Sequence, residues 1–186
     1  MTRNVILLMM VMVPLVAAGC GRAISEGLGE VRGASGLVMP IDPPSDTPNP
    51  SQLAAYRRFQ LGQIRDDIGG RLPARFLTLL CEEFAHELAD KHLPNQPDGK
   101  TLLVRGAIVH YEDAGTMGSV ISPLEEVICR TEFVDAESGR VLAVTNCIGR
   151  TNTSLNLGVK TKAQGLAKAL VGWVDKHYPK DNRPGG

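Results

Sequence analysis

The stretch EEVICRTEFVDAESGRVLAVTNCIGR, residues 125–150, decides the fold that we expect for this chain. Two runs rich in β-branched and aromatic residues are joined by the segment from Asp135 to Gly139. The Asp135 side chain can bond the backbone of its own turn, and Gly139 can adopt the left-handed conformation that a four-residue loop requires. The stretch therefore predicts a β-hairpin in which Asp135 pairs with Arg140.

The register of this hairpin determines where its two cysteines point. Counting from the Asp135–Arg140 pair, one face is apolar and comprises Val127, Cys129, Thr131, Phe133, Leu142, Val144 and Ile148. Cys129 then lies opposite Asn146, so Cys129 and Cys147 point to opposite faces, whereas a shift of one residue brings them together. A Cys129–Cys147 disulfide and two separate buried thiols are therefore alternative interpretations.

Segments on both sides of the hairpin supply the other expected elements. Residues 56–66 carry a strand signal, and residues 101–112 are apolar on both faces, as in a central strand. Residues 72–94 and 160–178 have the three-and-four spacing of amphipathic helices. The first helix is expected to bury Phe76, Leu77, Leu80, Cys81, Phe84 and Leu88. Its polar face is expected to carry Glu82, Glu83, Glu87 and Asp90.

The order of these elements predicts an α+β fold. We expect a two-layer sandwich in which two amphipathic helices pack on one face of a four-stranded, mostly antiparallel sheet. The opposite face would then be more apolar than a monomer normally exposes. This candidate interaction face comprises Leu103, Ala107, Val109, Tyr111, Ile128, Val134, Val141 and Ala143. The segment GLVMPI at 36–41 either belongs to a tether or packs on the domain as an edge strand.

The composition is that of one globular domain with extensions. Hydrophobic residues make up 43% of the 186 residues and charged residues 22%, which suffices for a sizeable core. Twenty basic side chains balance twenty acidic ones, and aromatic residues are only 4%. Neither electrostatic capture of nucleic acid nor stacking against bases is therefore expected.

The N-terminal stretch predicts export and lipidation. Arg3 precedes an apolar run at 5–16 that is too short to span a membrane, and LVAAGC at 15–20 ends in Cys20. This segment resembles the lipobox of bacterial lipoproteins, which implies acylation of Cys20 and attachment to the membrane through the lipid. Gly21 follows the cysteine, and by the same resemblance the protein lies on the outer membrane and faces the periplasm.

The chain is accordingly expected to divide into four parts. Residues 1–19 form the signal peptide, 20–52 a lipid-anchored flexible tether, 53–179 a single α+β domain and 180–186 a disordered tail. The tether prediction depends on its density of Gly and Pro, which favours flexible and then extended chain.

Three stretches of the domain carry a resemblance to known families. They are LLVRGAIVHYE (102–112), TEFVDAESGRVLAVTN (131–146) and the closing helix with Trp173. They resemble small bacterial lipoprotein domains of unknown function, whose common core is helix, strand, hairpin and helix. More distantly, the domain is similar to the periplasmic α/β domain of curli-export lipoproteins. That similarity implies assembly into rings, and no catalytic residue comes with it.

Two polar clusters are candidates for chemistry. The first comprises Glu83, His86, Glu87 and Asp90. Glu-x-x-His also occurs in carboxylate metal sites, but this is the polar face of the helix, so we interpret it as solvated surface and expect no metal or other cofactor. The second is His110 at the end of the central strand, which with Ser119 or Ser122 would suit a hydrolase, although no G-x-S-x-G elbow supports this.

Together these features favour a non-catalytic, lipid-anchored envelope protein that acts through protein–protein contacts as an accessory or assembly factor. Its partner would be an unknown envelope protein or another copy of the chain. The alternative is a periplasmic carrier or sensor for a small apolar ligand held between sheet and helices. That alternative predicts a pocket lined by Leu80, Phe84, Ile108 and Trp173. An envelope hydrolase that uses His110 is the third hypothesis.

Overall fold

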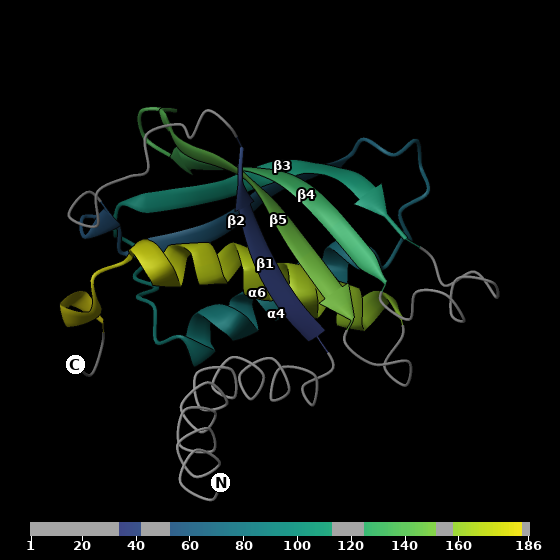
Figure 1. Ribbon diagram of the computed structural model, residues 1–186. Coiled ribbons are helices and arrows are strands. Elements are labelled where there is room, and N and C mark those ends of the chain that lie inside the picture. The colour runs from purple at the N-terminus through teal and green to yellow at the C-terminus, as the bar shows by residue number, and fades with distance from the viewer. Residues whose placement is uncertain (1–33, 42–52, 113–124, 152–157, 184–186) are drawn as a thin grey trace, which may run out of the picture.

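The computed structural model describes residues 34–41, 53–112, 125–151 and 158–183. They contain five strands, two α-helices and one short 3₁₀ helix (Figure 1). The strands are β1 (Ala34–Pro40), β2 (Arg58–Asp66), β3 (Thr101–Tyr111), β4 (Glu126–Asp135) and β5 (Val141–Thr151). The helices are α4 (Phe76–Asp90), α6 (Val159–His177) and η1 (Lys180–Asn182).

The five strands form one mixed sheet in the order β1-β5-β4-β3-β2. Neighbours from β1 to β3 pair antiparallel, whereas β2 pairs parallel with β3. The parallel pair arises because α4 carries the chain back across the sheet between these two strands. The predicted α+β class with two helices on one face is confirmed (Figure 1). The expected four-stranded, mostly antiparallel sheet is corrected to five strands in a mixed sheet.

The additional strand, β1, comes from the segment expected to be a tether. Residues 34–40 pair with residues 145–151 of β5 along the whole of β1. The edge-strand alternative for GLVMPI is therefore correct, and the tether prediction is wrong for these residues. Residues 1–33, which include Cys20 and the predicted signal peptide, and residues 42–52 lie outside the described residues.

The turn of the hairpin follows the prediction. Asp135 Oδ1 accepts hydrogen bonds of 3.0 Å from the backbone N–H groups of Glu137 and Ser138. Gly139 has a φ of 70°, in the left-handed region. The backbone N–H of Asp135 donates to the carbonyl of Arg140 at 2.9 Å, which confirms the pairing expected at the turn.

The register beyond the turn differs from the prediction by one residue. Val134 pairs with Val141, but Phe133 pairs with Ala143 rather than with Leu142. The cause is a β-bulge, which sets two residues of one strand against one of the other and reverses the side-chain alternation beyond it. Ala143, Thr145, Cys147 and Gly149 therefore share the core-facing side, and Ile148 faces away from the helices.

α6 lies directly on the backbone of β1 and β5. Gly36 and Gly149 are cross-strand neighbours in this pair. A Cβ atom at Gly36 would lie 2.3 Å from the amide nitrogen of Ala169, and one at Gly149 would lie 2.3 Å from that of Leu166. Side chains with a Cβ atom do not fit at these distances, so only glycine permits this approach of helix to sheet.

α4 packs against α6, and this contact changes its buried face. The four large side chains predicted to be buried are buried: Phe76, Leu80, Phe84 and Leu88. Leu77 and Cys81, however, are exposed, whereas Glu83 and Glu87 are buried. The prediction was wrong for these four because α6 covers the flank of α4 that carries the two glutamates. Glu83, for example, lies 3.6 Å from the ammonium of Lys160 on α6.

Part of the predicted disordered tail packs on the domain. Residues 180–182 form η1, and the Asn182 side chain donates to the carbonyl of Ala54 at 3.4 Å. The guanidinium of Arg183 lies 2.8 Å from the carboxylate of Asp175 on α6. The tail prediction is therefore wrong for 180–183, and residues 184–186 lie outside the described residues. Among the described helices, none combines the length and apolar character needed to cross a membrane.

Candidate functional site

The sheet face that the helices leave open differs from the predicted interaction face. Two of the eight predicted members, Ala143 and Tyr111, lie on the helix-covered side instead. Ala143 pairs with Phe133 and belongs to the core. Tyr111 follows a second bulge, between Ile108 and His110 of β3. Both corrections have the same cause, a bulge that reverses the alternation of side chains.

The other six predicted members do not form a continuous apolar surface. Ala107 and Val134 are buried, Leu103 and Ile128 are half-buried, and only Val109 and Val141 are exposed, at 45% and 40%. The centre of this face is instead a charged groove, lined by Gln63, Arg65, Asp67, Arg105, Arg130 and Glu132. Arg105 Nε lies 2.8 Å from the carboxylate of Glu132. Charged side chains therefore interrupt the expected apolar face over β3 and β4.

Apolar side chains gather at the corner of the open face formed by β1. Leu37 of β1 pairs with Ile148 of β5, which pairs with Ile128 of β4, so the three stand in a row. Leu37 is 42% exposed, and Met39 further along β1 is 49% exposed. We call these four residues the β1 patch. Sequence reasoning missed Leu37 and Met39 because they were assigned to the tether, and Ile148 because of the register.

Cys129 and Cys147 face each other across β4 and β5. They are direct cross-strand partners, both fully buried, and the structure describes both as thiols. Burial raises the pKa of the Cys129 thiol to about 11 and that of Cys147 to about 12. The bulge supplies the one-residue shift that the disulfide alternative requires. Partners in this position have the Cα separation that a disulfide can bridge.

We predict that Cys129 and Cys147 become joined when the chain matures in an oxidising compartment. Chain denatured without reductant and treated with an alkylating reagent should then carry label at Cys81 but not at the pair. After reduction, both members of the pair should be labelled, which peptide mass spectrometry detects. The exposed Cys81 serves as the control for reagent activity. Full labelling of Cys129 and Cys147 without reductant would contradict the bridge.

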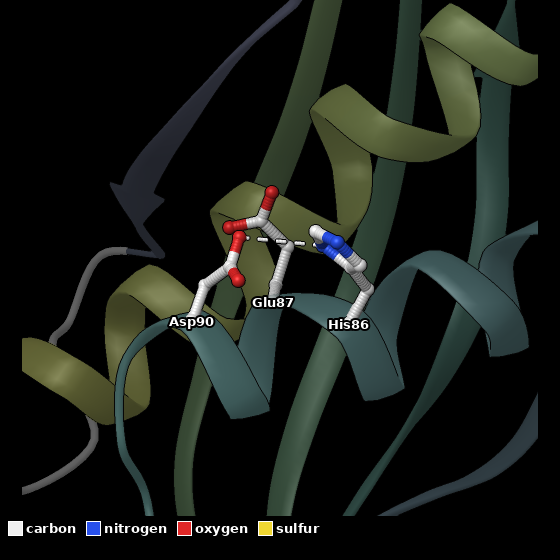
Figure 2. Close-up of side chains that lie close together, drawn as sticks. All are labelled: His86, Glu87 and Asp90. Atoms are coloured by element: carbon white, nitrogen blue, oxygen red, sulfur yellow. Dashed lines mark ion pairs between the residues drawn. The ribbon is translucent and has the colours of Figure 1, made fainter.

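A polar cleft lies where α4, α6 and the start of β1 meet; we call it the helix cleft. Its lining includes Ser35 and Gly36 from β1 and Gln164 and Lys168 from α6. From α4 it receives His86, Glu87 and Asp90, and one possible ligand atom from each of them lies within 4.8 Å of the other two (Figure 2). His86 Nδ1 lies 3.3 Å from Asp90 Oδ2. The structure thus brings together three members of the predicted polar cluster.

Glu87 distinguishes this cluster from ordinary helix surface. Glu87 is only 6% exposed, whereas the side chains of His86 and Asp90 are 65% and 58% exposed. Burial raises the pKa of the Glu87 carboxyl, while the nearby Lys168 ammonium acts in the opposite direction. Within the described part of the chain, this carboxylate has no hydrogen-bond or ion-pair partner. The expectation of a solvated face is therefore wrong at Glu87.

Lys162 of α6 forms a buried ion pair elsewhere in the domain. It is 1% exposed, and its Nζ lies 2.8 Å from the carboxylate of Glu125. The same ammonium donates to the carbonyl of Glu112 and lies 4.2 Å from the centre of the Tyr111 ring. These contacts join the first turns of α6 to the ends of β3 and β4. We therefore assign Lys162 a structural role, for which the local sequence carries no signal.

The residues proposed for an apolar-ligand pocket belong to one buried core cluster: Leu80, Phe84, Ile108 and Trp173. Trp173 stacks on Phe133 with ring centroids 3.6 Å apart. Neither the charged groove nor the helix cleft is lined by any of these side chains. Of the hydrolase residues, His110 is exposed at the end of β3, and Ser119 and Ser122 lie outside the described residues.

The described residues define a two-layer α+β domain whose mixed sheet carries two helices on one face. Its fold is similar to that of a PelC variant from Paraburkholderia phytofirmans, a dodecamer, with a TM-score of 0.50 and 17% sequence identity over 75% of this chain and 97% of that chain. A second PelC dodecamer structure from this organism has a TM-score of 0.49 and 16% identity over 74% and 96% of the chains. No family model and no curated protein matches the chain. At this identity the likeness concerns the fold.

Proposed function

We propose that this chain is a non-catalytic, lipid-anchored protein of the bacterial envelope that acts by associating with further copies of itself. The observation that carries the proposal is the β1 patch on an edge strand of the sheet. The lipobox resemblance at Cys20 supports the anchor, and with Gly21 after it supports a place on the outer membrane facing the periplasm.

The two edges of the sheet differ in how they are protected. Natural edge strands are usually blunted by charges, bulges or proline, because their free backbone groups can pair with another chain. β2 carries Arg58, Arg65 and Asp66 and has an irregularity between Leu61 and Ile64. β1 has no charged residue, and the only protective feature in its sequence is the proline at its end, Pro40. The β1 edge is therefore the one better suited to pair with a second chain.

The likeness to a dodecamer favours another copy of the chain as the partner. The similar PelC variant is itself a dodecamer. In this chain, exposed Leu37 and Met39 belong to β1, which is an edge strand among the described residues. Strand addition at an edge combines backbone hydrogen bonds with the burial of alternate side chains, and β1 offers an edge for the first and Leu37 and Met39 for the second. An accessory or assembly role would follow from such an interface.

The test is the mass of the full-length chain purified from membranes in mild detergent, measured by size-exclusion chromatography with light scattering. We expect a multiple of the monomer mass. A Leu37→Lys, Met39→Lys variant should shift the protein to monomer, because two charges would have to be buried at the interface. The intact mass of the same preparation should show acyl chains on Cys20.

Val109→Lys provides the matched control, because Val109 is also exposed on the open face but lies in the charged groove. It should leave the mass of the assembly unchanged. A monomeric wild type, or a Leu37→Lys, Met39→Lys variant that assembles as the wild type does, would contradict self-association through β1. An unmodified Cys20 would contradict the anchor independently.

A further inference from the structure

The helix cleft contains a carboxylate that the rest of the described fold leaves unpaired. Glu87 is 6% exposed and, among described residues, has neither a hydrogen-bond nor an ion-pair partner. Lys168 is close enough to act on it electrostatically, but its ammonium donates to the carbonyl of Ala34 at 3.3 Å. The Glu87 carboxylate lines the helix cleft and is not among the buried polar atoms cut off from solvent, so it can bind a cation that enters the cleft.

The neighbours of Glu87 are suitable metal ligands in a suitable arrangement. Figure 2 shows the carboxylates of Glu87 and Asp90 side by side, with the His86 ring facing them. His86 and Asp90 are four residues apart, which places both on one face of α4. Two ligands bound at about 2.0–2.2 Å to a tetrahedral ion lie about 3.4 Å apart. The distance from His86 Nδ1 to Asp90 Oδ2 is 3.3 Å, so this pair already has the required separation.

We propose that His86, Glu87 and Asp90 bind a divalent transition-metal cation of the zinc type. One imidazole nitrogen with two carboxylate oxygens suits Zn²⁺ and its neighbours in the first transition row. Ca²⁺ and Mg²⁺ prefer sites composed of oxygen ligands alone. Three protein ligands leave a fourth position of the ion open to water. The site is independent of the β1 patch and of the way in which copies associate.

The charges around the cleft predict how variants should differ. The ammonium of Lys168 opposes a cation at Glu87 and should weaken binding. Lys91 also lines the cleft, but its Nζ lies 3.9 Å from the carboxylate of Asp175. Removing the Lys168 charge should therefore strengthen metal binding, whereas removing a ligand should weaken it. If these side chains only stabilised the fold, the Lys168 variant and the ligand variants would not be expected to change metal affinity in opposite directions.

The experiment is calorimetric titration of ZnCl₂ into the full-length chain, treated with chelator and purified in detergent. We expect one saturable site per chain. His86→Ala and Asp90→Asn should each weaken it by about tenfold or more, since even outer-shell changes at metal sites cost about 10–100-fold. Lys168→Gln should tighten it severalfold. Saturating Zn²⁺ should raise the melting temperature of the wild type but not of His86→Ala.

His92→Ala is the matched control, because this exposed histidine follows α4 outside the cleft. Its affinity for zinc should equal that of the wild type. Circular dichroism checks that the variants fold, which we expect because His86 and Asp90 are exposed. The absence of saturable zinc binding in the wild type would overturn the proposal. Equal affinity in the wild type, His86→Ala and Asp90→Asn would overturn it as well.

Discussion

Replacing Asp135 with alanine is expected to lower the free energy of unfolding by about 3 kcal/mol. The Asp135 carboxylate is 3% exposed, accepts the hydroxyl of Tyr56 at 2.7 Å and lies 2.6 Å from Nζ of Lys100. It also holds the hairpin turn through two backbone N–H groups. Its loss leaves a buried hydroxyl without an acceptor, and denaturant titration measures the effect.

The same carboxylate should make stability fall in acid. The Lys100 ammonium, helped by the turn N–H groups and the Tyr56 hydroxyl, holds the pKa of Asp135 well below its usual range, against the opposing effect of burial. The folded state therefore binds this proton less tightly than the unfolded chain. The stabilisation is complete above about pH 5 and is lost as the pH falls through about 4 and below.

A matched variant separates this effect from general acid denaturation. Between about pH 5 and pH 2.5, the wild type should lose more stability than Asp135→Asn, which has no carboxyl to protonate. Glu137→Gln changes an exposed carboxylate in the same turn and should stay within about 0.5 kcal/mol of the wild type. If the free energy of unfolding fell equally with pH in the wild type and in Asp135→Asn, Asp135 would not be the group responsible.

Replacing Gly149 with alanine is expected to destabilise the domain by about 3 kcal/mol, because the new Cβ overpacks a close contact. That Cβ would lie 2.3 Å from the backbone nitrogen of Leu166, so α6 must move away from β5. Movement of α6 would loosen the core beneath it, which includes the stacked pair of Trp173 and Phe133. Thermal and denaturant unfolding both measure this loss.

Gly172→Ala is the control for this substitution. Gly172 lies within α6, and a Cβ there meets nothing within 4 Å. Alanine is the better helix former by about 1 kcal/mol, so this variant should be as stable as the wild type or more so. If both variants changed stability by the same amount, the proposed close packing of α6 on β5 would be wrong.

The local features of the fold were predictable from the sequence because they depend on neighbouring residues. The Asp135–Gly139 turn follows from side-chain and φ preferences that act within five residues. The apolar stripe of α6 follows from helical spacing. The bulge next to Val141 leaves no such pattern. Because the bulge could not be predicted, the predicted register of the hairpin was wrong. The predicted faces of Ala143 and Ile148 and the predicted orientation of the two cysteines were wrong for the same reason.

The site features depended on contacts between distant elements and were less predictable. Glu87 lies on the polar side of α4 by its spacing, and only the position of α6 shows that it is buried. β1 is short and its sequence has little periodicity, so its pairing with β5 depends on tertiary contacts rather than on a local sequence pattern. Leu37 and Met39 became recognisable as a patch only after that pairing was known. His86 and Asp90 were recognised as a cluster from spacing alone.

If Cys20 carries the lipid, the pairing of β1 with β5 also limits how far the domain can lie from the membrane surface. The first described residue is Ala34, and the chain from Cys20 to Ala34 can span at most about 50 Å even when fully extended. Ala34, Leu37 and Met39 belong to the same strand, so the proposed self-association edge would lie at the tethered end of the domain. Copies would then meet by diffusing within a thin layer above the lipid surface. A weak contact that is negligible in dilute solution can become well populated there, because confinement raises the effective concentration.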